Sequence, residues 1–433
     1  MQRWKLYIIL LFLMTKTQGE KDILDECMLE KELLTDLNSY DIESEYRTDD
    51  NITQIIVSCE AYEKQQEILE SLGKIKYHLP MIQSYVLEVN REEVKDILDI
   101  KEGWQVEIDA HITAQMNRAK DIINLGWAHE RKIYGEGIGV AVLDTGVSVH
   151  PDFGASKNRI VAFQDFINGR KNPYDDNGHG THVIGIIGGD GHESNGYYCG
   201  VAPRCDIIAL KVLNHKGNGN ISDVLAGLQW VINNKKKYNI RVVNISVGTS
   251  TNDSVDENSL LVKGVNAVWD QGIVVVVAAG NNGPKPMSIS TPGISRKVIT
   301  VGAYDDDIPV ELSGSKSKDY SGRGPTNSCI KKPDIVAPGS NIVSCNMIKN
   351  TKINAGVPLF PPRKGLVTAM YTTKSGTSMA TPIVSGAVAL LLSSEPELTN
   401  KDVKLRLKNS GKDLGFPWSK QGWGLLNIKD MLE

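Results

Sequence analysis

The chain is organised around Lys374-Ser375-Gly376-Thr377-Ser378-Met379-Ala380-Thr381-Pro382, which opens a strongly apolar helical segment running through residues 390–392. Backbone N–H groups point outward at the start of a helix, and the helix dipole favours negative charge there. A serine at this point, after a glycine and before small residues, is well placed to hold a nucleophile and the oxyanion that it creates. An ordinary N-cap is the structural alternative for Ser378, because serine and threonine are preferred at that position.

Short, continuous apolar runs lie upstream of this segment and are typical of strands covered on both faces. The clearest runs are 140–143, 207–212, 242–247, 273–279 and 298–301. Helical stretches such as 222–238 and 258–271 alternate with them. The alternation predicts an α/β fold with a parallel, helix-flanked sheet. In such sheets ligands bind at the carboxyl ends of the strands, so the chemistry is expected there.

A compact α+β unit of roughly a hundred residues is predicted ahead of this sheet. Strands are expected at 52–59, 84–89 and 104–112, and helices at 61–72 and 91–98. The unit contains no obvious catalytic group.

Composition narrows the class of protein. The 433 residues have room for one large domain and a smaller one. A formal net charge of -4 gives no electrostatic case for nucleic acid as a partner. The six cysteines are too few and too scattered for a disulfide framework or a zinc site, and no C-x-x-C pair exists. Cys199 and Cys205 could form a local disulfide, although free thiols are the preferred interpretation.

Two polar residues lie where predicted elements end or begin. Asp144 ends the first apolar strand, where a buried carboxylate needs a partner; a solvated turn aspartate is the alternative. His179 follows Asp176-Asn177-Gly178 and precedes an apolar helical stretch. His179 and His182 are three apart and could share a helix face as metal ligands. No glutamate lies between them as in zinc hydrolases, which favours a single catalytic imidazole with His182 as a packed neighbour.

A side-chain amide follows the predicted strand 273–279. Asn281 suits a left-handed turn and is also a candidate donor to a developing oxyanion. Acyl transfer at neutral pH needs a hydroxyl, an imidazole, a carboxylate that fixes the imidazole tautomer, and oxyanion donors. Ser378, His179, Asp144 and Asn281 supply all four, and the chain order Asp, His, Ser is a known version of this triad.

These residues and their neighbours resemble the subtilisin-like serine proteases. The matching blocks are Asp144-Thr145-Gly146, His179-Gly180-Thr181-His182, Ala278-Ala279-Gly280-Asn281 and residues 376–382. Residues 321–325 (Ser-Gly-Arg-Gly-Pro) and 332–339 (Lys-Pro-Asp-Ile-Val-Ala-Pro-Gly) make the chain most similar to bacterial alkaline proteases of the family. The resemblance covers roughly residues 127–407 and implies a subtilisin-like parallel sheet flanked by helices.

The resemblance also implies roles for the site residues. Asp144 would orient the imidazole, His179 would act as general base and then acid, and Ser378 would be the nucleophile. Asn281 and the Ser378 backbone N–H would form the oxyanion hole. No cofactor is then required for the chemistry.

A substrate-binding strand and pocket follow from the same resemblance. Ser246-Val247-Gly248 resembles the segment that pairs with the substrate backbone. Together with Ala278-Ala279-Gly280 it is expected to wall the pocket for the side chain before the scissile bond. The small residues suggest a roomy, apolar pocket, hence broad specificity towards proteins and peptides with hydrophobic residues favoured. The alternatives are a processing protease dedicated to one protein and a silent regulatory relative, but a silent relative should lack a triad residue.

The N-terminal α+β unit resembles the family's propeptide, which assists folding and blocks the cleft until it is cut off. We therefore expect a propeptide at 20–115, a catalytic domain at 116–433, and autocleavage between Asp109 and Ala119. A permanently attached accessory domain is the alternative.

The sequence does not decide whether the protein binds a metal ion. Many subtilisin-like proteases hold calcium in a long loop after the helix of the catalytic histidine, here residues 188–196. The loop contains Asp190, Glu193 and Asn195 but no recognisable ligand spacing, so structural calcium is possible. Residues 346–371 are expected to form a surface loop near Ser378.

The N-terminus carries a targeting pattern. Arg3 and Lys5 precede the apolar run 6–14, and Thr17-Gln18-Gly19 offers small residues for cleavage. A signal peptide at 1–19 would make the protein secreted or cell-surface. A buried or interfacial segment is the alternative, and the protein would then be cytoplasmic. No later segment is expected to span a membrane.

Overall fold

The computed structural model describes residues 52–59, 66–80, 83–90, 104–108, 115–155, 157–248, 258–312, 315–348 and 370–433. These residues belong to two compact units, Met1–Ile112 and Thr113–Glu433. The predicted signal peptide at 1–19, the predicted helix at 91–98, residues 109–114 of the expected cleavage interval and most of the expected loop at 346–371 lie outside the described residues.

The first unit contains a four-stranded antiparallel sheet of order β2-β3-β1-β4. Its strands are β1 (Ile52–Cys59), β2 (Lys74–Leu79), β3 (Ser84–Asn90) and β4 (Trp104–Ile108), and its described helix is α3 (Gln66–Leu72). Leu69 of the helix packs with alternate residues of the strands, including Ile55, Val57 and Leu87. This period-2 alternation is what a sheet with one covered face requires. Strand β2 was not predicted.

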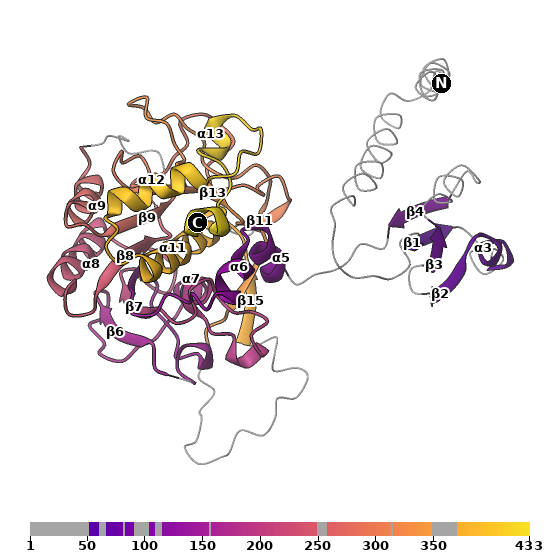
Figure 1. Cartoon of the computed structure of the whole chain (residues 1–433), viewed down its shortest axis with the longest axis horizontal. Coiled ribbons are helices and arrows are strands. Elements are labelled where there is room, and N and C mark those ends of the chain that lie inside the picture. Colours follow the sequence, from indigo (N-terminus) through magenta and orange to yellow (C-terminus); the bar gives the residue numbers. More distant parts are fainter. Residues whose placement is uncertain are drawn as a thin grey trace, which may run out of the picture. The chain divides into compact units, whose positions relative to one another are not determined.

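The second unit is built on a seven-stranded sheet of order β13-β10-β9-β8-β5-β7-β6, in which every neighbouring pair is parallel (Figure 1). The strands are β5 (Gly139–Asp144), β6 (Ile160–Asp165), β7 (Asp206–Lys211), β8 (Ile240–Ile245), β9 (Val274–Ala278), β10 (Ile299–Ala303) and β13 (Ile335–Ala337). All residues of β5, β9 and β10 are buried, as the continuous apolar runs predicted. The predicted α/β fold is confirmed.

Helices cover this sheet. The long helix α11 (Thr377–Ser394) packs against α7 (His179–Gly188) and against β8, β9 and β10. The helices α8 (Ile221–Asn234) and α9 (Leu260–Asp270) pack against each other and against β5 and β9 (Figure 1). Glycines precede the two helices that carry His179 and Ser378: Gly178 precedes α7 with φ 97°, and Gly376 precedes α11 with φ 128°.

The remaining elements complete the second unit. They are α5 (Gln115–Ile122), α6 (Leu125–Glu130), α12 (Asn400–Ser410), α13 (Trp418–Gln421), α14 (Ile428–Leu432), the 3-10 turns η3 (Pro151–Phe153) and η4 (His192–Ser194), and the two-stranded pairs β11 (Val310–Leu312) with β12 (Ser315–Ser317) and β14 (Ile342–Cys345) with β15 (Tyr371–Lys374). Strand β15 leads directly into the turn before α11, and α5 packs against β14.

One described helix is long and apolar enough to cross a membrane. It is α11, with a mean hydropathy of 1.4 over 18 residues, and 83% of it is buried inside the protein. This burial is that of a core helix, because α11 packs against β8, β9, β10 and β13 of the sheet.

Candidate active site

Asp144 and His179 meet at the carboxyl end of the sheet. Asp144 is the last residue of β5 and is 1% exposed, and His179 is the first residue of α7. The Nδ1 atom of His179 lies 2.8 Å from Oδ1 and 3.0 Å from Oδ2 of Asp144. The N–H of Thr145 donates to the same Oδ1 at 2.7 Å. Two donors therefore hold the carboxylate, and the carboxylate holds the imidazole with a proton on Nδ1.

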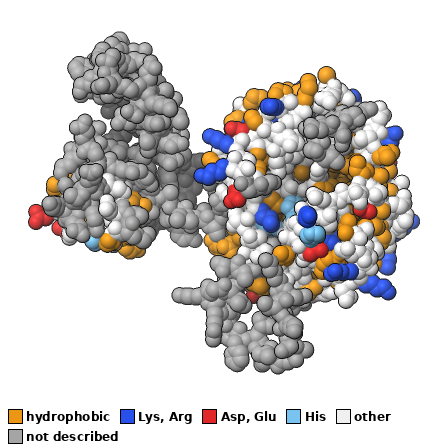
Figure 2. All heavy atoms as spheres, turned by 180° about the vertical axis from the view of Figure 1, so that it is seen from behind, with side chains coloured by type: hydrophobic (Ala, Val, Ile, Leu, Met, Phe, Trp, Pro, Cys, Tyr) orange, Lys and Arg blue, Asp and Glu red, His pale blue; other side chains and the backbone are white. Residues whose placement is uncertain are grey.

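The two histidines of α7 have opposite electrostatic environments. Burial opposes protonation of His179, but the charge and hydrogen bond of Asp144 outweigh it and raise the pKa of His179 above its ordinary value; Lys374 opposes the rise. Burial, followed by the charges of Lys374 and His179, lowers the pKa of His182 to about 3. His182 is fully buried, and its Nε2 lies 3.0 Å from the carbonyl oxygen of Ile342. His182 is therefore a neutral packed neighbour. Figure 2 shows histidine and basic side chains close together on one face of the second unit.

A buried lysine ties the two loops of this pair together. The Nζ of Lys211, at the end of β7, donates to the carbonyl oxygens of Thr145 at 2.6 Å and Leu213 at 2.8 Å and to the carboxylate of Asp176 at 2.7 Å. An ammonium has three N–H groups, so each has an acceptor. Thr145 follows Asp144 and Asp176 lies three residues before His179, so Lys211 fixes both loops.

Asp175 makes a second connection between the same loops. Its Oδ1 accepts from the Thr145 hydroxyl at 2.9 Å and from the N–H of Gly178 at 2.9 Å. Its Oδ2 accepts from the hydroxyl of Thr181 at 2.6 Å. Burial raises the pKa of Asp175, but these hydrogen bonds outweigh it and leave the pKa below its ordinary value. The turn before α7 is thus organised around an ionised carboxylate.

Ser378 is the second residue of α11, and the N-cap of that helix is Gly376. The alternative that Ser378 is the N-cap is therefore wrong. Its Oγ donates to the carbonyl oxygen of Ser246 at 2.8 Å. Among the described residues this carbonyl, and not the ring of His179, receives the hydroxyl proton of Ser378. The structure brings Asp144 and His179 into contact and leaves Ser378 bonded to the predicted substrate strand.

Asn281 is anchored through its side-chain oxygen. Its Oδ1 accepts from the N–H of Thr377 at 2.9 Å and from the Thr377 hydroxyl at 3.0 Å, which leaves Nδ2 as the donor beside the start of α11. A Cβ at Gly376 would lie 3.0 Å from this Nδ2, so glycine keeps the space open. The left-handed residue of the turn is Gly280, with φ 88°, and Asn281 is not among the positive-φ residues. The left-handed conformation expected for Asn281 is therefore wrong, and the expected donor role does not depend on it.

A cavity of about 210 Å³ adjoins Ser378 and Asn281. Its lining residues are Ser246, Val247, Gly248, Ala278, Gly280, Asn281, Asn282, Ser290, Thr377 and Ser378. The expected pocket residues all line it except Ala279, which is fully buried in a separate cluster with Ile289 and Ile294. The lining residues are small, as expected. The expected apolar character is wrong, because hydroxyl and amide groups dominate the lining.

Sequence reasoning missed Ser290 and Asn282. The Nδ2 of Asn282 donates to the Oγ of Ser290 at 3.1 Å. A Cβ added to Gly280 would lie 2.0 Å from that Oγ, so the glycine is needed for Ser290 to reach the cavity. No periodic pattern marks Ser290, which lies in the loop between β9 and β10. Lys211 carried a signal, because a lysine inside a predicted buried strand needs a partner for its charge.

The described cysteines are free thiols. Cys199, Cys205, Cys329 and Cys345 form no disulfide, so a bridge between Cys199 and Cys205 is wrong and the preferred interpretation holds for these four. Burial raises the pKa of Cys199 to about 11 and that of Cys205 to about 12, which keeps both thiols protonated.

Comparison with known proteins gives one consistent result. The profile of the subtilase family matches residues 135–424. The serine protease AprX of Bacillus subtilis (strain 168) is 37% identical over 355 residues, which cover 80% of this chain and 76% of that protein. Subtilisin Savinase of Lederbergia lenta is 35% identical over 302 residues, covering 70% of this chain and 93% of that protein. Among solved structures, Sphericase matches with a TM-score of 0.52 and 30% identity, covering 68% of this chain and 92% of that one.

Proposed function

Because this chain belongs to the subtilase family and is a subtilisin-like serine endopeptidase, we propose that Asp144, His179 and Ser378 form its catalytic triad. The observation that carries the proposal is the 2.8 Å contact between Asp144 and His179, at the same end of the sheet as the start of α11. Proteins are the substrates of such an enzyme, and the family needs no cofactor for its chemistry.

Substrate binding prepares the nucleophile in this proposal. The extended segment 246–248 adds the substrate backbone as a strand, so a substrate N–H competes for the carbonyl oxygen of Ser246. The hydroxyl of Ser378 now donates to that oxygen. Once displaced, it turns to Nε2 of His179, which is the acceptor because the proton of the neutral ring is held on Nδ1 by Asp144.

The chemical steps then follow from the geometry. Ser378 Oγ attacks the scissile carbonyl carbon as its proton passes to His179 Nε2. The resulting oxyanion is held by Asn281 Nδ2 and the backbone N–H of Ser378. His179 gives the proton to the leaving amine, and water, deprotonated by the same ring, hydrolyses the acyl-enzyme.

The cavity beside Ser378 receives the side chain before the scissile bond. Its small lining residues accept many side chains, and Ser290 with Asn282 makes one part of the lining polar. We therefore infer broad specificity for uncharged side chains, with hydrophobic ones accepted along Val247 and Ala278. A charged side chain has no opposite charge among these lining residues.

The first unit acts as a propeptide in this proposal and is removed from the catalytic domain that follows it. It is a separate compact unit with its own core, which suits a segment that is cut off. Helix α5 begins at Gln115 and packs against β14 in the second unit. This packing favours a cut before Gln115, within the expected interval 109–119. Secretion or surface location depends on a signal peptide at 1–19, which N-terminal sequencing of the native protein tests.

A fluorophosphonate probe for active serines tests the triad. The processed wild-type protein should be labelled and should hydrolyse casein, and Ser378→Ala should do neither. Folded, processed wild-type protein that stays unlabelled would refute the assignment.

A further inference from the structure

The loop after α7 is the place where calcium binding can be judged from the structure. The subtilase family commonly binds calcium, and the sequence suggested residues 188–196 as the candidate loop. Calcium takes six to eight oxygen ligands, mostly carboxylates and backbone carbonyls. A fit therefore requires carboxylate and carbonyl oxygens with free lone pairs turned towards one point.

The nearest buried carboxylate, Asp152, is already occupied by protein donors. Its Oδ1 accepts from the N–H of Glu193 at 3.1 Å, so the loop meets it with a donor. Its Oδ2 accepts from the hydroxyl of Tyr371 at 2.9 Å and from the thiol of Cys345 at 3.5 Å. Burial, and then the charge of Asp152, raise the pKa of Cys345 well above its ordinary value, which keeps the thiol protonated as a donor.

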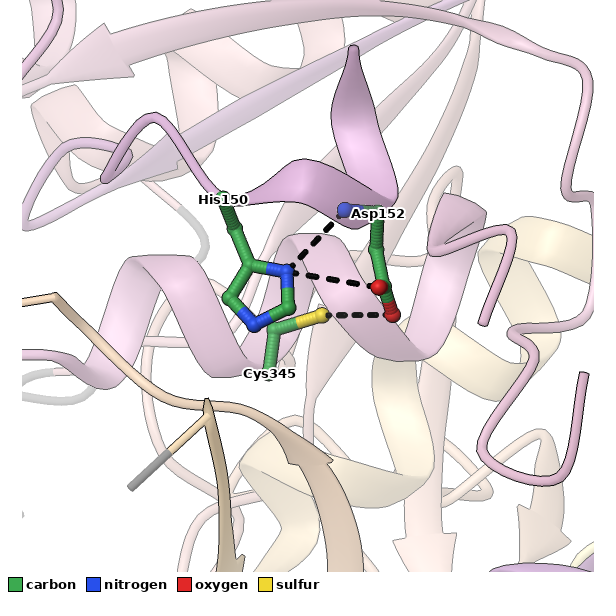
Figure 3. Close-up of side chains that lie close together, drawn as sticks. All are labelled: His150, Asp152 and Cys345. Atoms are coloured by element: carbon green, nitrogen blue, oxygen red, sulfur yellow. Dashed lines mark hydrogen bonds and ion pairs between the residues drawn. The ribbon is translucent and has the colours of Figure 1, made fainter. Parts of the chain in front are cut away.

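His150 lies beside Asp152 and Cys345 (Figure 3). Both of its ring nitrogens have hydrogen-bond partners. His150 Nε2 lies 2.9 Å from the carbonyl oxygen of Met370, and its Nδ1 accepts from the N–H of Asp152 at 3.1 Å. His150, Asp152 and Cys345 have ligand atoms within 4.8 Å of one another. Binding a metal ion there would require deprotonation of the thiol and loss of these hydrogen bonds.

The buried guanidinium of Arg159 binds backbone carbonyl oxygens at the start of the loop and beside it. Arg159 is 3% exposed, and its two terminal nitrogens donate to the carbonyl oxygens of Gly188 and Asp152. Its Nη2 lies 3.9 Å from Oδ2 of Asp190. Two carbonyls and a carboxylate of the kind that calcium uses thus surround a side-chain cation.

A second side-chain cation binds the other end. Lys120 Nζ donates to the carbonyl oxygen of Tyr197 at 3.0 Å. Between the two ends the backbone satisfies itself: the carbonyl of Gly189 accepts from Gly200, and that of Gly191 accepts from Ser194 and Gly196. The carbonyl oxygens of Gly189, Gly191 and Tyr197 therefore face protein donors.

We propose that the loop at 189–199 holds no calcium ion and that Arg159 and Lys120 supply the positive charge that braces it. The guanidinium is part of the chain, so its positive charge is always present and the loop needs no ion from the solvent. A calcium ion would have to displace Arg159 from its carbonyls and turn the Glu193 N–H away from Asp152.

Thermal unfolding of the full-length Ser378→Ala protein tests the proposal, because this variant cannot digest itself. Its melting temperature in excess EDTA and in excess calcium should differ by less than about 1 °C. Arg159→Met should lower the melting temperature by roughly 5 °C in both buffers, since buried carbonyls lose their donors. Arg204→Met is the matched control, because Arg204 lies exposed in a surface pair with Glu136, and it should change by less than about 1 °C.

The outcomes separate cleanly. A calcium-induced rise of several degrees that Asp152→Asn or Asp190→Asn abolishes would place an ion in this loop and overturn the proposal. A rise that both variants retain would place the ion outside this loop and would support a loop at 189–199 that holds no calcium. Equal melting temperatures for Arg159→Met and Arg204→Met would refute the brace. The readout is independent of proteolysis, so failure of the proposed triad would not affect it.

Discussion

The Nζ of Lys211 lies 2.6 Å from the carbonyl oxygen of Thr145, and this contact sets a buried cation directly behind the Asp144–His179 pair. Lys211 and Asp144 are partners in the parallel register of β7 and β5. The ammonium therefore binds the backbone carbonyl of the residue that follows the proposed orienting carboxylate. It acts on the imidazole only through the positions of the two loops that it joins.

Lys211→Met should weaken both the fold and catalysis. Removing the ammonium leaves two buried carbonyls and the partly exposed Asp176 without their donor. The free energy of unfolding should therefore fall by about 3 kcal/mol. The kcat should fall about 10-fold or more with a smaller change in KM, because the misplaced pair acts after binding. Lys297→Met, which breaks an exposed pair with Asp270, is the control and should change neither quantity. Unchanged kcat in a stable Lys211→Met protein would contradict this positioning role.

The pH dependence should report the environment of His179. A general base must be unprotonated, so kcat/KM should rise with pH through an apparent pKa above the ordinary histidine value. Asp144→Asn should lower kcat by about 10⁴-fold and move the apparent pKa down, because Asp144 is what raises it. Lys374→Gln should move it up, because Lys374 opposes protonation. The apparent pKa should therefore shift in opposite directions in these two variants. Measuring kcat/KM for one peptide ester across a range of pH tests this.

Asn281→Leu should slow the chemical step with little change in binding. Loss of one oxyanion donor costs about 10²–10³-fold in kcat. Because Asn281 Oδ1 also accepts from Thr377, the start of α11 is expected to loosen, which Asn281→Asp would avoid while still removing the donor. Steady-state kinetics of both variants provide the measurement. An increase confined to KM would show that Asn281 binds substrate in its ground state only.

Ser290→Gly should enlarge the cavity at the point where the Ser290 hydroxyl meets Gly280. Peptides with Phe or Tyr before the scissile bond should gain about 10-fold in kcat/KM relative to peptides with Ala. A peptide-library digest measures the ratio, and its wild-type profile separates a broad protease from one dedicated to a single sequence. An unchanged ratio would mean that Ser290 does not limit the pocket.

Self-processing should depend on Ser378. The wild-type protein is expected to lose its first unit with a new N-terminus before Gln115, and Ser378→Ala should retain it. Gel mobility and N-terminal sequencing of the two proteins provide the measurement. Loss of the first unit from the purified Ser378→Ala protein would refute self-processing.

Most of the central sheet could be predicted, because its inner strands are buried on both faces and read as unbroken apolar runs. The outer strands β6 and β13 were not predicted, each for a different reason. Strand β6 is only partly buried, so its apolar run is interrupted, and β13 has three residues. Hydrogen bonding along an existing sheet defines such strands more than their own composition does.

The candidate site was predictable where chemistry imposes a motif and unpredictable where packing decides. Asp144, His179, Asn281 and Ser378 lie in short segments whose glycines and small residues are required locally. Ser290 enters the cavity only because the loop between β9 and β10 folds it against Gly280, a contact that no local pattern encodes. The direction of the Ser378 hydroxyl could not be predicted either, because it donates to the carbonyl oxygen of Ser246, which is distant in the sequence.

The position of α11 has a consequence for the order of events during synthesis. Asp144 and His179 leave the ribosome roughly two hundred residues before Ser378, yet β8, β9 and β10 cannot bury their inner face until α11 exists. A nascent chain therefore holds the proposed base before the proposed nucleophile, and a sheet that α11 does not yet cover. The same helix covers these strands and carries Ser378, so the proposed triad is assembled only when this part of the core is complete.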